Sequence, residues 1–109
     1  MIEATFHMEG SRIESFQVEG HSGLASQGED ILCAAVTSAV RLTECAVNDV
    51  LGLEASVKVR PEKALISLKL PGGLGQTNES TCQTLLAGLM VYFIQLQEEY
   101  PEHIIVMEV

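Results

Sequence analysis

Five short segments of strand character alternate with two long helical segments, and this order constrains the fold most. The strand segments span residues 2–9, 12–19, 54–60, 64–70 and 103–109. The first four show apolar side chains at alternate positions, the pattern of strands with one buried face. A Gly10-Ser11 turn joins the first two into a predicted hairpin, and Pro61-Glu62 turns the chain between the next two. The order predicts one ββαββαβ domain over residues 1–109, of the α+β class, with two helices packed on a mostly antiparallel mixed sheet.

The first helix is expected over residues 31–51, a stretch rich in Ala, Val and Leu that contains no Gly or Pro. Asp30 is its predicted N-cap, and Gly52 follows at the usual C-terminal position. Its apolar stripe extends over more than one face, so we expect the helix to be covered on two sides, by the sheet and by a partner helix. The second helix is expected from about Asn78 to Tyr100, before Pro101.

The chain is acidic, with fifteen Asp and Glu against six Lys and Arg and a formal net charge of −9. Such a surface repels a phosphate backbone and attracts a basic protein or peptide, so direct nucleic-acid binding is not expected. Solubility alone also explains this charge. No long apolar run predicts a membrane span, and the N-terminal residues begin as a strand rather than as a signal peptide.

The three cysteines form no CxxC pair, which argues against a disulfide scaffold or a zinc ribbon and favours a reducing cytosol. The glycine-rich residues 71–75 lack the Lys-Ser or Lys-Thr of a nucleotide-binding loop, and the three histidines form no ligand set. We therefore expect no metal and no cofactor. Cys45 and Cys82 lie in apolar helical surroundings and are interpreted as buried structural cysteines.

Cys33 differs, because it lies in the first turn of the predicted first helix. Unpaired N–H groups and the helix dipole favour an anion there, and so favour a thiolate. His21 stands at the other end of the ten-residue loop, where the second strand finishes. A thiolate and an imidazole are the minimum for cysteine nucleophilic catalysis, with first-turn amides to stabilise the oxyanion. From spacing alone, a buried helical cysteine and an unrelated loop histidine explain the pattern equally.

These residues also carry a family resemblance. Gly20-His21, the glycine-containing loop and the run GEDILCAAVT from Gly28 to Thr37 resemble the signature of the ribosomal-processing cysteine protease family (Prp). The resemblance covers the whole chain, including both hairpins, the second helix and the closing strand.

The resemblance implies that His21 is the catalytic histidine and Cys33 the nucleophile. Asp30 matches a recurring acidic position, where it either orients His21 or caps the helix, and spacing favours the cap. Thr37 lies one helical turn after Cys33, where the family has Ser or Thr, so its hydroxyl is expected to face the site. The glycines of the intervening loop, Gly20, Gly23 and Gly28, would let it open for a peptide and close again.

The family removes a short N-terminal extension from ribosomal protein twenty-seven of the large subunit in certain bacteria, and its members are homodimers. The resemblance therefore implies a cytoplasmic bacterial endopeptidase that acts on a basic ribosomal protein during ribosome assembly. Two other functions remain open: a thiol-based redox sensor that uses Cys33, and a non-catalytic dimeric adaptor that binds an extended peptide along a sheet edge.

Overall fold

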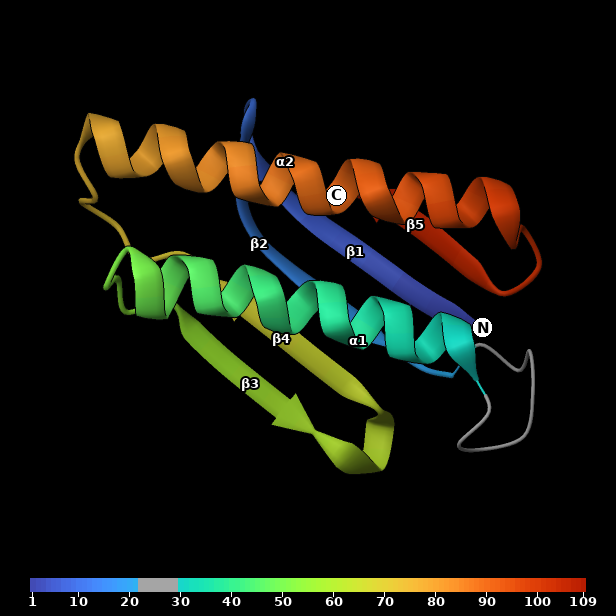
Figure 1. Cartoon of the computed structure of the whole chain (residues 1–109). Helices are drawn as coiled ribbons and strands as arrows, with labels where there is room; N and C mark the ends of the chain where they lie inside the picture. The colour runs from blue at the N-terminus through green and yellow to red at the C-terminus, as the bar shows by residue number, and fades with distance from the viewer. Residues whose placement is uncertain (22–29) are drawn as a thin grey trace.

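The computed structural model describes residues 1–21 and 30–109, and in this part of the chain two helices lie side by side across one face of a five-stranded sheet (Figure 1). The main elements are β1 (Ile2–Glu9), β2 (Arg12–Glu19), α1 (Ile31–Glu44), β3 (Ser56–Arg60), β4 (Leu65–Lys69), α2 (Gln76–Glu99) and β5 (Ile104–Glu108). A π-helical segment, Cys45–Val50, continues α1, and a 3-10 turn, Pro61–Lys63, joins β3 to β4. The predicted ββαββαβ order is confirmed.

The strands are arranged in the order β3-β4-β2-β1-β5. Neighbouring strands pair antiparallel except β1 and β5, which are parallel. The sheet is therefore mixed and mostly antiparallel, as predicted. β3 and β5 form its two edges, and β3 lies on the side of α1 (Figure 1).

The core lies between the sheet and the helices, where alternate strand positions point inward. Phe6 and Phe16 are directly opposite each other on β1 and β2, with ring centroids 5.7 Å apart. Phe93 of α2 approaches Phe6 at 6.2 Å between centroids. All three rings are fully buried, and each contributes about 1.5–3 kcal/mol through removal from water. This aromatic cluster joins α2 to the central strands.

The first helix occupies the predicted range, but its last turn is π-helical, with the Leu51 N–H donating to the Ala46 carbonyl five residues back. Gly52 follows in the left-handed region at φ +69°. The buried stripe against the sheet consists of Leu32, Val36, Val40 and Val47. Val50, at the end of the π-helical segment, is 80% exposed and lies outside this buried stripe.

The same helical stretch, Ile31–Val50, is long and apolar enough to cross a membrane by length and composition alone. In this structure its buried stripe packs on the sheet instead, together with the strand residues of the core. The pattern therefore fits a core helix of a two-layer α+β fold.

The starts of β3 and α2 each differ by two residues from the sequence-based expectation. β3 begins at Ser56 rather than at residue 54, because the Asn48 side chain takes both backbone groups of Ala55, at 2.9 Å from its N–H and 3.1 Å from its carbonyl. α2 begins at Gln76, two residues before the expected Asn78. Neither shift moves a candidate site residue.

The two remaining cysteines have different environments. Cys82 is fully buried in α2, as predicted, and burial raises the pKa of its thiol. Cys45 is exposed, so its interpretation as a buried structural cysteine is wrong. Thr43 and Val47, two positions before and after it, are the buried residues of that turn, which leaves Cys45 on the opposite side of the helix.

Candidate active site

Cys33 lies in the first turn of α1, and Asp30 caps this turn. The Asp30 Oδ1 atom accepts a hydrogen bond from the Cys33 N–H at 3.0 Å, and the Asp30 carbonyl accepts one from the Ala34 N–H at 3.1 Å. The predicted N-cap is therefore confirmed. The cap hydrogen bonds hold the backbone of Cys33 in place. The residue itself is half-buried and lines a cavity.

His21 follows the end of β2, and the backbone before it is tightly constrained. Gly20 has a φ of +98°, and a Cβ atom at this position would lie 2.4 Å from the Met1 carbonyl oxygen. Only glycine fits here without displacement of a neighbour. The Gly20 N–H also donates to the Ala64 carbonyl at 3.2 Å. His21 is exposed, and the residue before it is hydrogen-bonded to the turn between β3 and β4.

One cavity of about 320 Å³ brings His21, Cys33 and Thr37 together between the start of α1 and the end of β2. Its remaining lining is contributed by Ile2, Val18, Gly20, Val36, Val59, Pro61, Ala64, Leu65 and Ile66. Thr37 therefore lines the candidate site, as expected one helical turn after Cys33. The predicted loop glycines Gly23 and Gly28 lie outside the described residues.

Sequence reasoning missed the wall that the β3–β4 turn contributes to this cavity. The alternation of Val59 and Ile66 signalled inward-facing strand positions but gave no indication that they border the site. Ala64 was expected as the first inward-facing position of the strand 64–70, and this is wrong: it adopts the left-handed conformation, with φ 48° and ψ 46°, at the end of the 3-10 turn, and β4 begins at Leu65. A non-glycine residue there costs on the order of 1 kcal/mol. This conformation accompanies the two hydrogen bonds of Ala64, from its N–H to the Pro61 carbonyl and from the Gly20 N–H to its own carbonyl.

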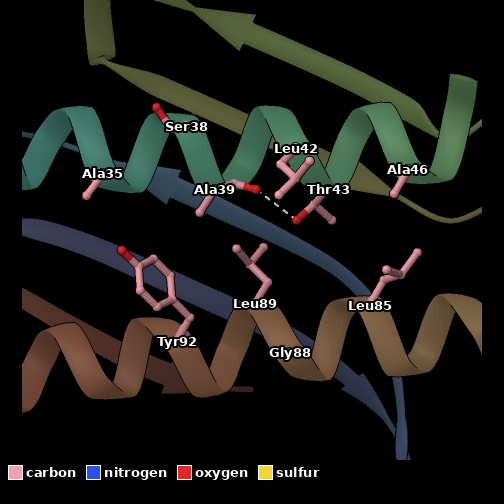
Figure 2. A pocket seen from close by; sticks show the side chains of 10 residues that line it. All are labelled: Ala35, Ser38, Ala39, Leu42, Thr43, Ala46, Leu85, Gly88, Leu89 and Tyr92. Atoms are coloured by element: carbon pink, nitrogen blue, oxygen red, sulfur yellow. Dashed lines mark hydrogen bonds between the residues drawn. The ribbon is translucent and has the colours of Figure 1, made fainter.

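A larger cavity of about 500 Å³ lies between α1 and α2, lined by the sides of the two helices that face each other (Figure 2). Its lining is mostly small and apolar, with Leu85, Leu89 and Tyr92 of α2 pointing toward α1. The Thr43 hydroxyl donates to the Ala39 carbonyl at 2.9 Å and is thereby satisfied. None of the residues lining it is a cysteine, histidine, aspartate or glutamate. Of these two cavities, the smaller is the one lined by a cysteine and a histidine.

Comparison with known proteins places the chain in a family. The family model described as "Cysteine protease Prp" matches residues 1–105. The chain belongs to this cysteine protease family. The resemblance of the whole chain to this family is confirmed by this match. A curated relative, the ribosomal processing cysteine protease Prp of Bacillus subtilis, is 27% identical over 105 residues, which cover 95% of this chain and 94% of the relative.

Solved structures agree with the fold. A Staphylococcus aureus ribosomal processing protease Prp in complex with a covalently linked product peptide matches with a TM-score of 0.89 at 18% identity, over 100% of both chains. A Streptococcus mutans protein matches with a TM-score of 0.85 at 24% identity, over 100% of this chain and 94% of its own. A second S. aureus Prp structure, with a substrate peptide, gives a TM-score of 0.83 at 17% identity over 100% of both chains. These three structures share the fold of this chain.

Proposed function

We propose that this Prp family member is an endopeptidase in which Cys33 is the nucleophile and His21 the general base and acid. The observation that carries the proposal is the shared cavity: both side chains line it, from elements separated in sequence and fixed independently. Such a pair, with access for a substrate, is the apparatus of cysteine nucleophilic catalysis.

In the proposed reaction, His21 accepts the Cys33 thiol proton while the sulfur attacks the carbonyl carbon of the scissile peptide bond. The tetrahedral intermediate collapses as the C–N bond breaks, and His21 returns the proton to the leaving amine. Water then attacks the thioester, with its proton passing through His21 back to the sulfur. The products are a new carboxylate, a new amine and the free enzyme.

The helix start restricts which amides stabilise the oxyanion. The Cys33 N–H is engaged by the Asp30 side chain, and the Ala34 N–H by the Asp30 carbonyl. A helix start leaves its first amides without intrahelical acceptors, and here these are the N–H groups of Ile31 and Leu32. We assign the oxyanion to this pair of donors, which the positive end of the helix dipole assists.

For the substrate we propose the N-terminal extension of large-subunit ribosomal protein twenty-seven, cleaved in the bacterial cytoplasm during ribosome assembly. The B. subtilis relative is named as a ribosomal processing protease, and the S. aureus Prp structures carry product and substrate peptides. The net charge of −9 supports the encounter with a basic ribosomal protein by electrostatic steering.

We further propose that the protein forms a homodimer through the outward face of its helices. The α1–α2 cavity is apolar, and Leu42 and Tyr92 on its rim are 71% and 39% exposed. A second copy would cover the second apolar side of α1 expected from the sequence. Light scattering coupled to size-exclusion chromatography tests this: a dimer mass that Leu42→Glu reduces to a monomer mass is expected, and a wild-type monomer contradicts it.

Mass spectrometry of the ribosomal protein's N-terminal segment tests the enzymatic proposal directly. The segment is incubated with the wild-type protein and with its Cys33→Ala variant, and cleavage at one bond by the wild type alone is expected. Two other outcomes reject the proposal. An uncut segment with a reactive, reversibly oxidised Cys33 favours a redox sensor, and an uncut segment that still binds favours an adaptor. Neither Cys45 nor Cys82 lines the cavity in the described part of the chain, which supports hydrolysis over a paired redox centre.

A further inference from the structure

The sheet has one face without helices. Both helices lie across the same side of it, so in the described part of the chain the opposite side, which we call the open face, has no covering element (Figure 1). Val59 of β3 and Leu68 of β4 face the helices, since the first lines the cavity of α1 and the second is buried in the core. Side chains alternate along a strand, so Lys58, Arg60 and Lys69 point to the open face.

The cations of this acidic chain are concentrated in the same hairpin. Four of the six Lys and Arg residues lie between positions 58 and 69, and Glu62 is the only acidic residue in that range. The rest of the chain has fourteen acidic residues against two arginines. The net charge of −9 therefore describes the molecule as a whole and not this hairpin. The expectation that nucleic acid is repelled applies to the rest of the surface.

A shallow hollow of about 170 Å³ lies on the open face, across β2, β3 and β4. It is lined by Ser15, Phe16, Gln17, Ser56, Lys58, Ser67, Leu68 and Lys69. Phe16 and Leu68 are buried with their side chains in the core, so the accessible groups are three serine hydroxyls, one amide and two ammonium groups. None of the lining residues is Asp or Glu. Hydroxyls, amides and ammonium groups are the donors that proteins direct at phosphate oxygens.

The chemistry of the hollow favours a nucleic acid over a protein partner. The centre of a protein–protein interface is apolar and poor in lysine, whereas a nucleic-acid interface is polar and rich in positive charge. The lining offers no accessible apolar side chain. It also offers no accessible aromatic ring on which an unpaired base could stack. A double helix, which presents its phosphates with its bases already stacked, is the form that such a surface fits.

The three cations differ in availability. Lys58 and Arg60 are exposed, and neither has an acidic partner within 4.0 Å among the residues that the structure describes. Lys69 is 3.5 Å from a carboxylate oxygen of Glu14, with 65% of its side chain exposed. A surface ion pair of this kind is weak, so a phosphate can compete with the Glu14 carboxylate for Lys69.

We propose that the open face of the β3–β4 hairpin binds the phosphate backbone of a double-helical nucleic acid, without regard to base sequence. Lys58 and Arg60 pair with phosphates, and the serine hydroxyls and the Gln17 amide donate to phosphate oxygens. Lys69 joins them when it leaves Glu14. The cavity of Cys33 lies on the helix side of the sheet, so this binding does not depend on peptide cleavage.

Fluorescence anisotropy of a labelled RNA duplex, and of a DNA duplex of the same sequence, tests the proposal over a series of NaCl concentrations. Non-specific binding of this kind has a Kd of roughly 10⁻⁴–10⁻⁶ M at physiological salt. We expect log K to fall with log salt at a slope between about −2 and −3, as for two or three phosphate contacts. Lys58→Gln should weaken binding to both duplexes and reduce the slope by about one.

Glu14→Gln gives the opposite expectation. It frees Lys69 for phosphate and should tighten duplex binding by roughly two- to fivefold, the equivalent of one surface ion pair. Arg41→Gln is the matched control for Lys58→Gln, because it changes the net charge equally but lies on α1, on the helix side of the sheet. It should leave both the Kd and the salt slope unchanged.

Three outcomes overturn the proposal. The first is no binding of either duplex at low salt, and the second is an equal effect of Lys58→Gln and Arg41→Gln, which would reflect net charge alone. The third is tighter binding of a labelled polyglutamate peptide than of the duplexes, lost in Lys58→Gln, which would assign the open face to an acidic protein segment. Circular dichroism verifies folding, and Arg60→Gln replaces Lys58→Gln if that variant does not fold.

Discussion

The carboxylate of Asp30 accepts a hydrogen bond from the backbone N–H of Cys33 at 3.0 Å, so the N-cap of α1 is attached directly to the candidate nucleophile. The cap satisfies an amide that the helix start would leave unpaired, and it places a negative charge beside the sulfur-bearing residue. Stability of the helix start and position of the nucleophile therefore depend on the same contact.

Replacement of Asp30 separates capping from a direct role in catalysis. Asp30→Ala should lower the free energy of unfolding by about 1 kcal/mol, and Asp30→Ser should recover most of this loss, because a serine hydroxyl also caps. Urea unfolding measures the stability, and kcat/KM on the ribosomal segment measures the activity. If Asp30→Ser restores stability while turnover stays low, the carboxylate acts on His21 rather than only on the helix.

Cys33→Ala and His21→Ala should each abolish measurable cleavage, since one removes the nucleophile and the other the proton carrier. Loss of a general base alone typically costs about 10²–10⁴-fold in rate. Both variants should retain the wild-type circular dichroism spectrum, because His21 is exposed and Cys33 is only half-buried. Substantial turnover by either folded variant contradicts the assigned roles.

Gly20→Ala should be damaging to both stability and activity. The added Cβ would lie 2.4 Å from the Met1 carbonyl oxygen, in a backbone conformation that alanine rarely adopts. Gly73→Ala is the control, because Gly73 also has a positive φ, +68°, but has nothing within 4 Å of an added Cβ. Thermal unfolding should show a distinctly larger loss for Gly20→Ala than for Gly73→Ala. Equal losses would mean that the chain relieves the contact without cost.

The buried thiol of Cys82 should respond to alkaline pH. Burial raises its pKa in the folded state above the ordinary value of 9.0, so the unfolded thiol ionises first as the pH rises. Its contribution to stability is complete below that value and falls above it. Stability curves of the wild type and Cys82→Ala should therefore converge at alkaline pH, whereas parallel curves would contradict a perturbed thiol.

The same contrast in burial predicts the order of thiol labelling. In the native protein a thiol reagent should modify the exposed Cys45 readily and Cys82 only after unfolding. Peptide mapping by mass spectrometry identifies the labelled position. Labelling of native Cys82 at the rate of Cys45 would contradict the packing of α2.

Local patterns in the sequence were sufficient to predict most of the fold. Alternation around Phe6 and Phe16 identified a hairpin because one face of each strand is buried, and Asp30 and Gly52 marked the helix ends through backbone requirements that operate locally. The placement of Cys33 in the first helical turn followed from the same cap. His21 and Cys33 were expected to be close, and the structure places both on one cavity.

Features that depend on neighbours distant in sequence were not predictable in this way. The exposure of Val59 follows from the edge position of β3, which alternation does not reveal. The contribution of Ala64 to the site requires the Gly20 contact, across more than forty residues. The burial predicted for Cys45 failed because apolar neighbours along the chain do not show which side of a helix meets the sheet.

The close approach of Gly20 to the Met1 carbonyl also matters for how the protein is produced in the laboratory. An affinity tag fused ahead of Met1 would emerge beside His21, at the mouth of the cavity, and would compete with peptides for entry. Val109 exchanges hydrogen bonds with Met8 and Phe6 toward the other end of β1, about 20 Å along the strand. Purification handles placed after Val109 therefore leave the candidate cavity open, and activity assays are best carried out with such material.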